Sequence, residues 1–173
     1  AEATTHALSA IPRYKLAQGF SVFGGLRLQS AEASISVPAA GNYTMNSDRA
    51  VDLGYLAGVA WEKPEIAARV SLTYNSGIKH DLALTESVGG GPASSVSRVE
   101  TPQSVNLDFQ TGVAANTLVF GSVRWADWTS FSLTSPNYPG GSPVGTLVSY
   151  DNDVITYSLG LGYKFSESFS GAV

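Results

Sequence analysis

The sequence contains no cysteine, only one methionine and only two histidines. The absence of cysteine excludes disulfides, thiolate metal sites and a cysteine nucleophile. Charge is also scarce, because charged residues make up 14% of the 173 residues while 43% are apolar, and this combination is unusual for a water-soluble domain. Acidic residues outnumber basic ones by 14 to 10, so nucleic acid is not an expected partner.

Long apolar runs are missing as well. No stretch of about 18 consecutive apolar residues occurs, which excludes a transmembrane helix. The other structure that satisfies every backbone polar group in lipid is a closed β-barrel. The 18 glycines, 8 prolines and 10% aromatic residues fit a β-rich chain with many turns better than a helical one.

What the sequence does contain is alternation of apolar and polar residues with a period of two, typical of strands. In the segment 155–165, for example, Ile155, Tyr157 and Leu159 lie on one face, and Thr156 and Ser158 lie on the other. Such segments predict about seven strands, with an eighth beginning at Phe169. The predicted strands are 5–16, 20–37, 51–61, 66–75, 104–115, 118–132 and 155–165.

Short and long connections alternate strictly along the chain. The short turns are 17–19, 62–65, 115–117 and 166–168, and the long linkers are 38–48, 85–99 and 133–148. Because consecutive antiparallel strands return to the same edge at every second connection, all short turns lie at one end and all long loops at the other. This asymmetry is typical of an outer-membrane barrel, with short periplasmic turns and long extracellular loops.

The composition of the two faces favours lipid over water as the solvent of the apolar face. A soluble sandwich or barrel, the alternative β fold, would carry Lys and Glu on its outer face, whereas the polar face here is mainly Gly, Ser, Thr and Asn. We therefore predict an antiparallel transmembrane β-barrel, present in part, whose polar face lines a wet lumen. Glycines on that face leave room inside the barrel or allow the strands to bend: Gly25, Gly54, Gly58, Gly112, Gly160 and Gly162.

Register and strand ends give further predictions. Pairing like face with like face sets Ser9 opposite Arg27 in the first hairpin and Trp61 opposite Ile66 in the second. In the third hairpin, Asp108 is expected opposite Arg124 as a charge pair on the polar face. Aromatic residues near the strand ends are expected to form interfacial girdles: Tyr14, Phe20, Trp61, Tyr74, Tyr163 and Phe165.

Three runs carry a resemblance to a known family. Thr101-Pro102-Gln103-Ser104-Val105-Asn106-Leu107 opens one strand, and the next strand ends in Trp125-Ala126-Asp127-Trp128-Thr129-Ser130-Phe131. An earlier run, Arg69-Val70-Ser71-Leu72-Thr73-Tyr74-Asn75-Ser76, has the pattern R-x-x-L-x-Y-x-S. In this order and spacing the runs resemble the FadL-type long-chain fatty acid transporters of Gram-negative outer membranes.

The resemblance implies a monomeric barrel of about fourteen strands, plugged by an N-terminal hatch, in the outer membrane of a Gram-negative bacterium. Its implied function is passive uptake of long-chain fatty acids or other hydrophobic molecules, including aromatic hydrocarbons, with outer-membrane lipid around the barrel. Residues 1–173 are expected to form a single partial β-barrel domain, an internal segment without the hatch and the remaining strands. The alternative function is a structural or adhesive outer-membrane barrel without transport.

Candidate ligand-binding residues lie in one loop and on the polar face. Tyr138 and Leu147, in the loop 133–148, are candidates for an apolar capture surface; alternatively, Pro and Gly only order this loop. Arg27, Arg69 and Arg124 are expected to face inward and could attract a carboxylate head group.

Structural roles are the alternative for the same charged residues. The arginines could instead pair with Asp52, Asp108 and their neighbours to hold the lumen wall, which is the interpretation favoured for Arg124. His80 is expected at a solvated strand end.

No catalytic motif is recognisable. The sequence has neither a Gly-x-Ser-x-Gly elbow nor a His-Glu-x-x-His motif, and Gly89-Gly90-Gly91-Pro92 lacks the ending of a phosphate-binding loop. Asp151-Asn152-Asp153 lacks the glycine and distal glutamate of a calcium-binding loop. An outer-membrane lipase or protease would need a converging nucleophile or acid–base set, so we expect no enzyme activity, no cofactor and no metal.

Overall fold

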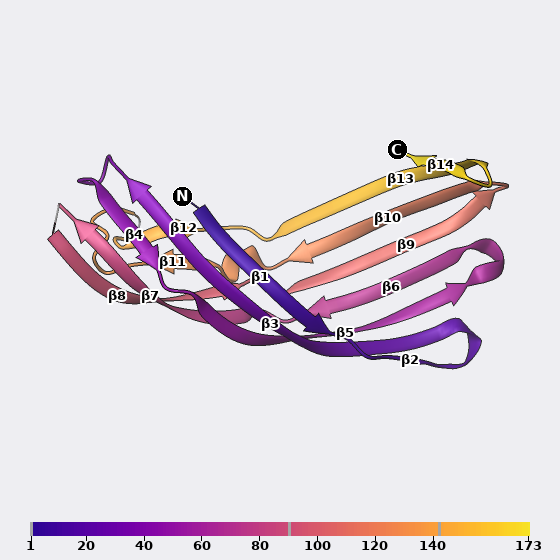
Figure 1. The fold of residues 1–173 in the computed structure, drawn as a ribbon, viewed down its shortest axis with the longest axis horizontal. Coiled ribbons are helices and arrows are strands. Elements are labelled where there is room, and N and C mark those ends of the chain that lie inside the picture. Colours follow the sequence, from indigo (N-terminus) through magenta and orange to yellow (C-terminus); the bar gives the residue numbers. More distant parts are fainter. Residues whose placement is uncertain (1, 90, 142) are drawn as a thin grey trace.

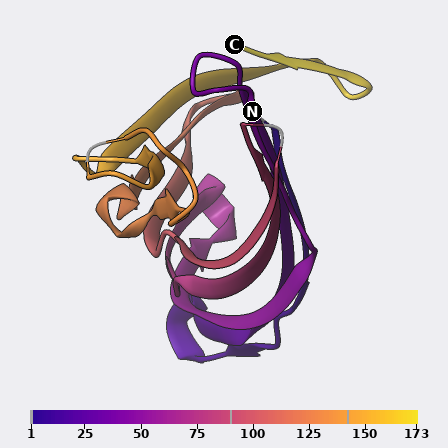
Figure 2. The same ribbon diagram turned by 90° about the vertical axis from the view of Figure 1, so that its left-hand side faces the viewer.

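The computed structural model describes residues 2–89, 91–141 and 143–173, and nearly all of its regular structure is antiparallel β-sheet. The main sheet forms a long curved trough with the short turns at one end and the long loops at the other (Figure 1). The end-on view in Figure 2 shows the sheet curving around a concave side. None of the helices in the described ranges has the length and apolar character needed to span a membrane.

The predicted strand succession is confirmed. Neighbours in the sheet follow the order β14-β13-β10-β9-β6-β5-β3, and β1 and β2 both pair with β3. The first predicted strand, 5–16, is divided into β1 and β2, and the eighth strand begins at Phe169 as expected. These strands are β1 (Glu2–Ala10), β2 (Arg13–Lys15), β3 (Phe20–Val37), β5 (Ala50–Lys63), β6 (Ala68–Asn75), β9 (Ser104–Ala114), β10 (Thr117–Ala126), β13 (Val154–Ser166) and β14 (Phe169–Ala172).

The loop end is more ordered than the sequence analysis predicted. The expected linker 85–99 is wrong, because β7 (Ile78–Val88) and β8 (Gly91–Thr101) form a long hairpin there. β4 (Tyr43–Ser47) pairs with the far end of β3 on one side and with β7 on the other. The linker after β10 contains a 3₁₀ turn, η3 (Trp128–Ser130), and a small sheet of β11 (Ser132–Thr134) and β12 (Thr146–Ser149).

One predicted register is confirmed and two are wrong. Ser9 lies opposite Arg27, as predicted. Trp61 lies opposite Val70 rather than Ile66, because a 3₁₀ turn, η2 (Pro64–Ile66), and a left-handed Ala67 place the turn further along the chain. Each wrong register is displaced by an even number of residues, so the assignment of residues to faces still holds.

The second wrong register concerns Arg124. It lies opposite Asn106 rather than Asp108, because Thr117 instead of Leu118 pairs with Ala114 and the register then shifts by one more residue between Thr117 and Leu118. Asp108 lies opposite Ser122 instead. The expected cross-strand charge pair is therefore not formed in this hairpin.

The apolar faces of the strands are exposed, as a lipid-facing surface requires. Along β13, Tyr157 and Leu159 are 81% and 76% exposed. In a water-soluble fold a continuous face of this kind would be buried, because contiguous apolar patches are rarely left in contact with water. The exposed face includes Leu8, Tyr14, Phe20, Leu26, Leu28, Leu53, Tyr55, Val59, Leu72, Ile155, Leu161, Tyr163 and Phe165.

Three of the inward glycines accommodate the chain's own atoms rather than leaving room for a guest, whereas at Gly162 the nearest atom to an added Cβ is Leu118 Cβ at 3.7 Å. A side chain at Gly58 would collide with the ring of Phe23, and one at Gly160 would collide with the ring of Phe120. At Gly54 the space is taken by the side chain of Ile78. These glycines therefore allow close packing on the concave side of the sheet.

Candidate functional site

The inner face of β3 changes character along the strand. Near the short turns it carries polar residues such as Ser21 and Arg27, whereas towards the loops it carries Ala31, Ala33 and Ile35. Because alternate residues of a strand share a face, these three side chains lie in one row. The row forms an apolar floor beneath the loop end of the sheet.

A cavity of about 250 Å³ lies over this floor. We call it the loop-end cavity. Three parts of the chain enclose it: the inner face of β1 and β3, the β7–β8 hairpin, and the segment from Phe131 to Tyr150. Its apolar lining comes mainly from Ala33, Ile35, Leu82, Val99, Leu133 and Val148. An apolar cavity of this size can hold a small hydrophobic molecule, since a 150 Å³ apolar cavity is known to bind benzene.

Tyr138 and Leu147 lie beside this cavity rather than in its lining. Both pack against the buried hydrophobic cluster at the loop end. Tyr138 contacts Tyr43, with ring centroids 5.0 Å apart. The structure thus brings the two predicted loop residues together, and their role in capture stays a prediction. The cluster consists of Tyr43, Met45, Leu82, Leu84, Val99 and Leu133.

A buried carboxylate, Glu86, ties the loop to the β7–β8 hairpin. One of its oxygens accepts hydrogen bonds from the hydroxyls of Tyr43 and Ser135. The other accepts from Ser95 Oγ at 2.6 Å and from Asn137 Nδ2 at 2.8 Å. The four donors come from β4, β8 and the loop after β11, so this one side chain joins three separate segments.

The charge of Glu86 is maintained by these donors. Burial alone raises the pKa of Glu86, but the hydrogen bonds from Ser135, Ser95, Tyr43 and Asn137 outweigh it and lower the pKa below the usual value. Burial and the neighbouring Glu86 carboxylate raise the pKa of Tyr43 to about 12. Glu86 is therefore the acceptor of the group and Tyr43 one of its donors.

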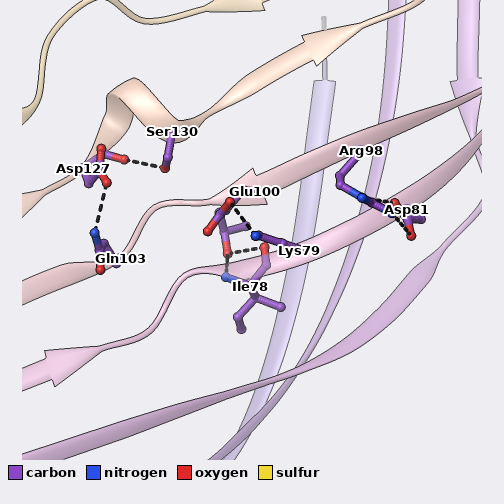
Figure 3. A network of polar contacts seen from close by, with 9 residues as sticks. Ile78, Lys79, Asp81, Arg98, Glu100, Gln103, Asp127 and Ser130 are labelled. Carbon is purple, nitrogen blue, oxygen red and sulfur yellow. Dashed lines mark hydrogen bonds and ion pairs between the residues drawn. The ribbon is translucent and has the colours of Figure 1, made fainter.

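Two of the three runs that carried the family resemblance, 101–107 and 125–131, contact each other (Figure 3). Gln103 donates from Nε2 to Asp127 Oδ2 at 3.1 Å, and the Asp127 amide donates to the Gln103 carbonyl at 3.0 Å. Hydrogen bonds from Thr129 and Gln103 lower the pKa of Asp127 below its usual value. Together these contacts fix the start of the loop that covers the cavity.

The β7–β8 hairpin is also tied across its strands by ion pairs, which Figure 3 shows. Arg98 Nε lies 2.7 Å from Asp81 Oδ1, and Lys79 Nζ lies 3.7 Å from Glu100 Oε2. Both pairs are exposed, so each contributes little to stability.

The three candidate arginines do not converge. Arg27 donates from Nε to Ser9 Oγ at 3.2 Å, and Arg69 Nε lies 3.4 Å from Glu62 Oε1 near the short turns. Within the described part of the chain, Arg124 has no carboxylate within 4.0 Å. None of the three lines the loop-end cavity. Their binding of a head group stays a prediction.

His80 is the functional candidate that the sequence analysis missed. It was expected at a solvated strand end, but its side chain is fully buried. Its Nδ1 lies 2.7 Å from Asp52 Oδ2, and the ring helps to line the loop-end cavity. The signal was present in the sequence, since His80 lies two residues from both Ile78 and Leu82 and therefore shares the buried face of β7 with them.

The fold defines the class of protein. A curved antiparallel sheet with an exposed apolar face, a largely polar concave face, short turns at one end and long loops at the other is part of a transmembrane β-barrel. No family model matches the sequence, and no curated protein matches it.

Solved structures place this fold with FadL-type barrels. The chain is similar to a FadL homologue of Pseudomonas aeruginosa, with a TM-score of 0.67 and 17% identity over 97% of this chain and 48% of that one. It is also similar to the toluene transporter TodX of Pseudomonas putida, with a TM-score of 0.62 and 14% identity over 98% of this chain. A deletion mutant of TodX, described as a monoaromatic hydrocarbon channel, has a TM-score of 0.60, 15% identity and the same coverage of this chain.

These matches concern the fold. The chain spans about half the length of the solved structures, 48% of the FadL homologue and 54% of TodX. It therefore has the fold of part of a FadL-type barrel, as the three sequence runs predicted.

Proposed function

We propose that this protein mediates passive uptake of hydrophobic small molecules, either long-chain fatty acids or aromatic hydrocarbons, across the outer membrane of a Gram-negative bacterium. The observation that carries the proposal is the loop-end cavity. It is apolar, and it lies at the loop end, where an extracellular molecule would arrive. The similarity in fold to a FadL homologue and to a toluene transporter supports it.

In this account the cavity is the capture site. A lipopolysaccharide leaflet resists apolar molecules, so uptake needs a surface outside the membrane that removes them from water. Tyr138, Leu147 and the cluster beneath them hold one wall of the cavity in place. Arg27, Arg69 and Arg124 are proposed to favour an anionic head group further along the concave face. We also propose that the protein works as a monomer in outer-membrane lipid.

Uptake into reconstituted vesicles tests the proposal. The full-length protein is placed in proteoliposomes whose outer leaflet contains lipopolysaccharide, and the arrival of oleate or toluene at an enclosed reporter is timed. Faster arrival than in protein-free vesicles supports transport. Arrival of both compounds no faster than in protein-free vesicles would instead favour the alternative, a structural or adhesive barrel.

A matched pair of variants locates the capture site. Ala33→Phe fills the loop-end cavity, whereas Ala57→Phe adds the same ring to the lipid-facing side of β5. If the cavity captures the cargo, Ala33→Phe slows uptake and Ala57→Phe leaves it unchanged. Equal uptake by both variants would move the capture site elsewhere.

A further inference from the structure

The side chain of His80 leaves one hydrogen-bonding atom unused. Nδ1 faces Asp52, and an ionised carboxylate can only accept, so Nδ1 carries the proton and donates. Nε2 is buried and has no hydrogen-bond partner among the described residues. A buried polar atom without a partner costs free energy, and native structures rarely leave one without a reason.

The position of His80 gives that reason. Its neighbours on the buried face of β7 are Ile78, which packs on Gly54, and Leu82, which lines the loop-end cavity. The imidazole is therefore a polar group set into the wall of an otherwise largely apolar cavity. Binding sites for small molecules typically combine an apolar lining with a few fixed polar groups that orient the ligand.

We propose that the loop-end cavity binds a neutral hydrophobic compound carrying a hydroxyl group, an alcohol or a phenol, whose O–H donates to Nε2 of His80. This inference rests on the proposed function, because it concerns the same cavity as the capture site and adds hydroxylated compounds to the hydrophobic molecules that the cavity takes. Asp52 is the positioning residue, since its hydrogen bond to Nδ1 keeps the acceptor lone pair on Nε2.

The charges around the cavity favour a hydroxyl over a carboxylate. Glu2 and Glu32 only border the cavity, because they alternate with the inward Ala3 and Ala33, and Glu32 is paired with Arg49 through a contact of 3.1 Å. No arginine or lysine lines the cavity among the described residues. An anionic head group in the cavity would therefore find no cationic side chain in the lining to pair with, whereas a hydroxyl carries no charge to compensate and can donate to Nε2 of His80.

Three probes of equal chain length separate the possibilities: octanol, octane and octanoate. Each displaces a hydrophobic fluorophore from the full-length protein in micelles, and the same titrations are made with His80→Phe. The comparison between proteins cancels differences in how the probes partition into the micelle. Loss of one hydrogen bond predicts about a tenfold weaker affinity for octanol in the variant, with octane changed less than about twofold.

A second comparison, between octanol and octanoate on the unmodified protein, tests the proposal independently of the variant. At equal concentrations of free probe outside the micelles, the unmodified protein is expected to bind octanol more tightly than octanoate, a comparison that stands even if His80→Phe fails to fold. Tighter binding of octanoate, or an equal loss of octanol and octane in His80→Phe, would overturn the hydroxyl assignment while leaving capture in the cavity intact. If none of the probes displaces the fluorophore, the proposed capture site is overturned as well.

Discussion

Replacing Glu86 by Gln should release the loop from the hairpin. The two carboxylate oxygens each accept two hydrogen bonds, from Tyr43 and Ser135 on one side and from Ser95 and Asn137 on the other. An amide keeps only one of these oxygens, so two of the four donors must face an NH₂ group. A buried donor that loses its acceptor costs about 1–3 kcal/mol, so the variant should lose about 3 kcal/mol of loop stability.

Hydrogen exchange is the appropriate assay because the effect is local. A loss of about 3 kcal/mol corresponds to roughly hundredfold faster exchange of the β11 and β12 amides, provided that exchange occurs through opening of the loop. The matched control is Asp81→Asn on the same hairpin, where an exposed pair with Arg98 is broken and less than about 1 kcal/mol is expected. Equal protection in the Glu86→Gln and Asp81→Asn proteins would refute the reasoning.

Three further results are expected. The pKa of Glu86 is lower in the folded protein than its ordinary value of 4.5, so the ionised carboxylate stabilises the loop above pH 4.5, and this stabilisation is lost as the pH falls through the lower pKa. Hydrogen-exchange protection of the loop that is unchanged on acidification would contradict this. Gly58→Ala should destabilise the sheet by about 1–3 kcal/mol in denaturant unfolding, because its Cβ would collide with Phe23, whereas Gly162→Ala meets Leu118 only at 3.7 Å and should be tolerated. Arg124→Ala should change unfolding by less than about 0.5 kcal/mol, because no carboxylate partner is lost; a large destabilisation would restore a structural role for this side chain.

Strand faces could be predicted from the sequence because they depend on a local property. In β13, apolar residues from Ile155 to Leu161 alternate with small or hydroxyl residues, and a shift of register by two or four residues leaves that alternation intact. The same tolerance explains why the faces were right while two of three registers were wrong. Register depends on the geometry of the turn, and nothing in Glu62-Lys63-Pro64-Glu65 indicated that Ala67 would adopt a left-handed conformation.

The site was harder to predict because it depends on contacts between distant segments. Ile35, Leu82 and Val148 meet only after the β7–β8 hairpin and the loop before β13 fold over β3. Glu86 likewise binds donors as distant as Tyr43 and Asn137. His80 is different, because the alternation of residues 78–84 did indicate its buried face and would have identified it as a candidate.

The direction of the two faces is the central claim, and site-directed labelling tests it most directly. These 173 residues contain no cysteine, so single cysteines introduced here at outward positions (Ile155, Tyr157 and Leu159) can be compared with those at inward positions (Thr156 and Ser158). In the full-length protein in a bilayer, probes attached at Ile155→Cys, Tyr157→Cys and Leu159→Cys should be quenched by brominated lipid, whereas Thr156→Cys and Ser158→Cys should react with a charged maleimide from water. Quenching at Thr156→Cys and Ser158→Cys, or the same behaviour at all five positions, would contradict the account.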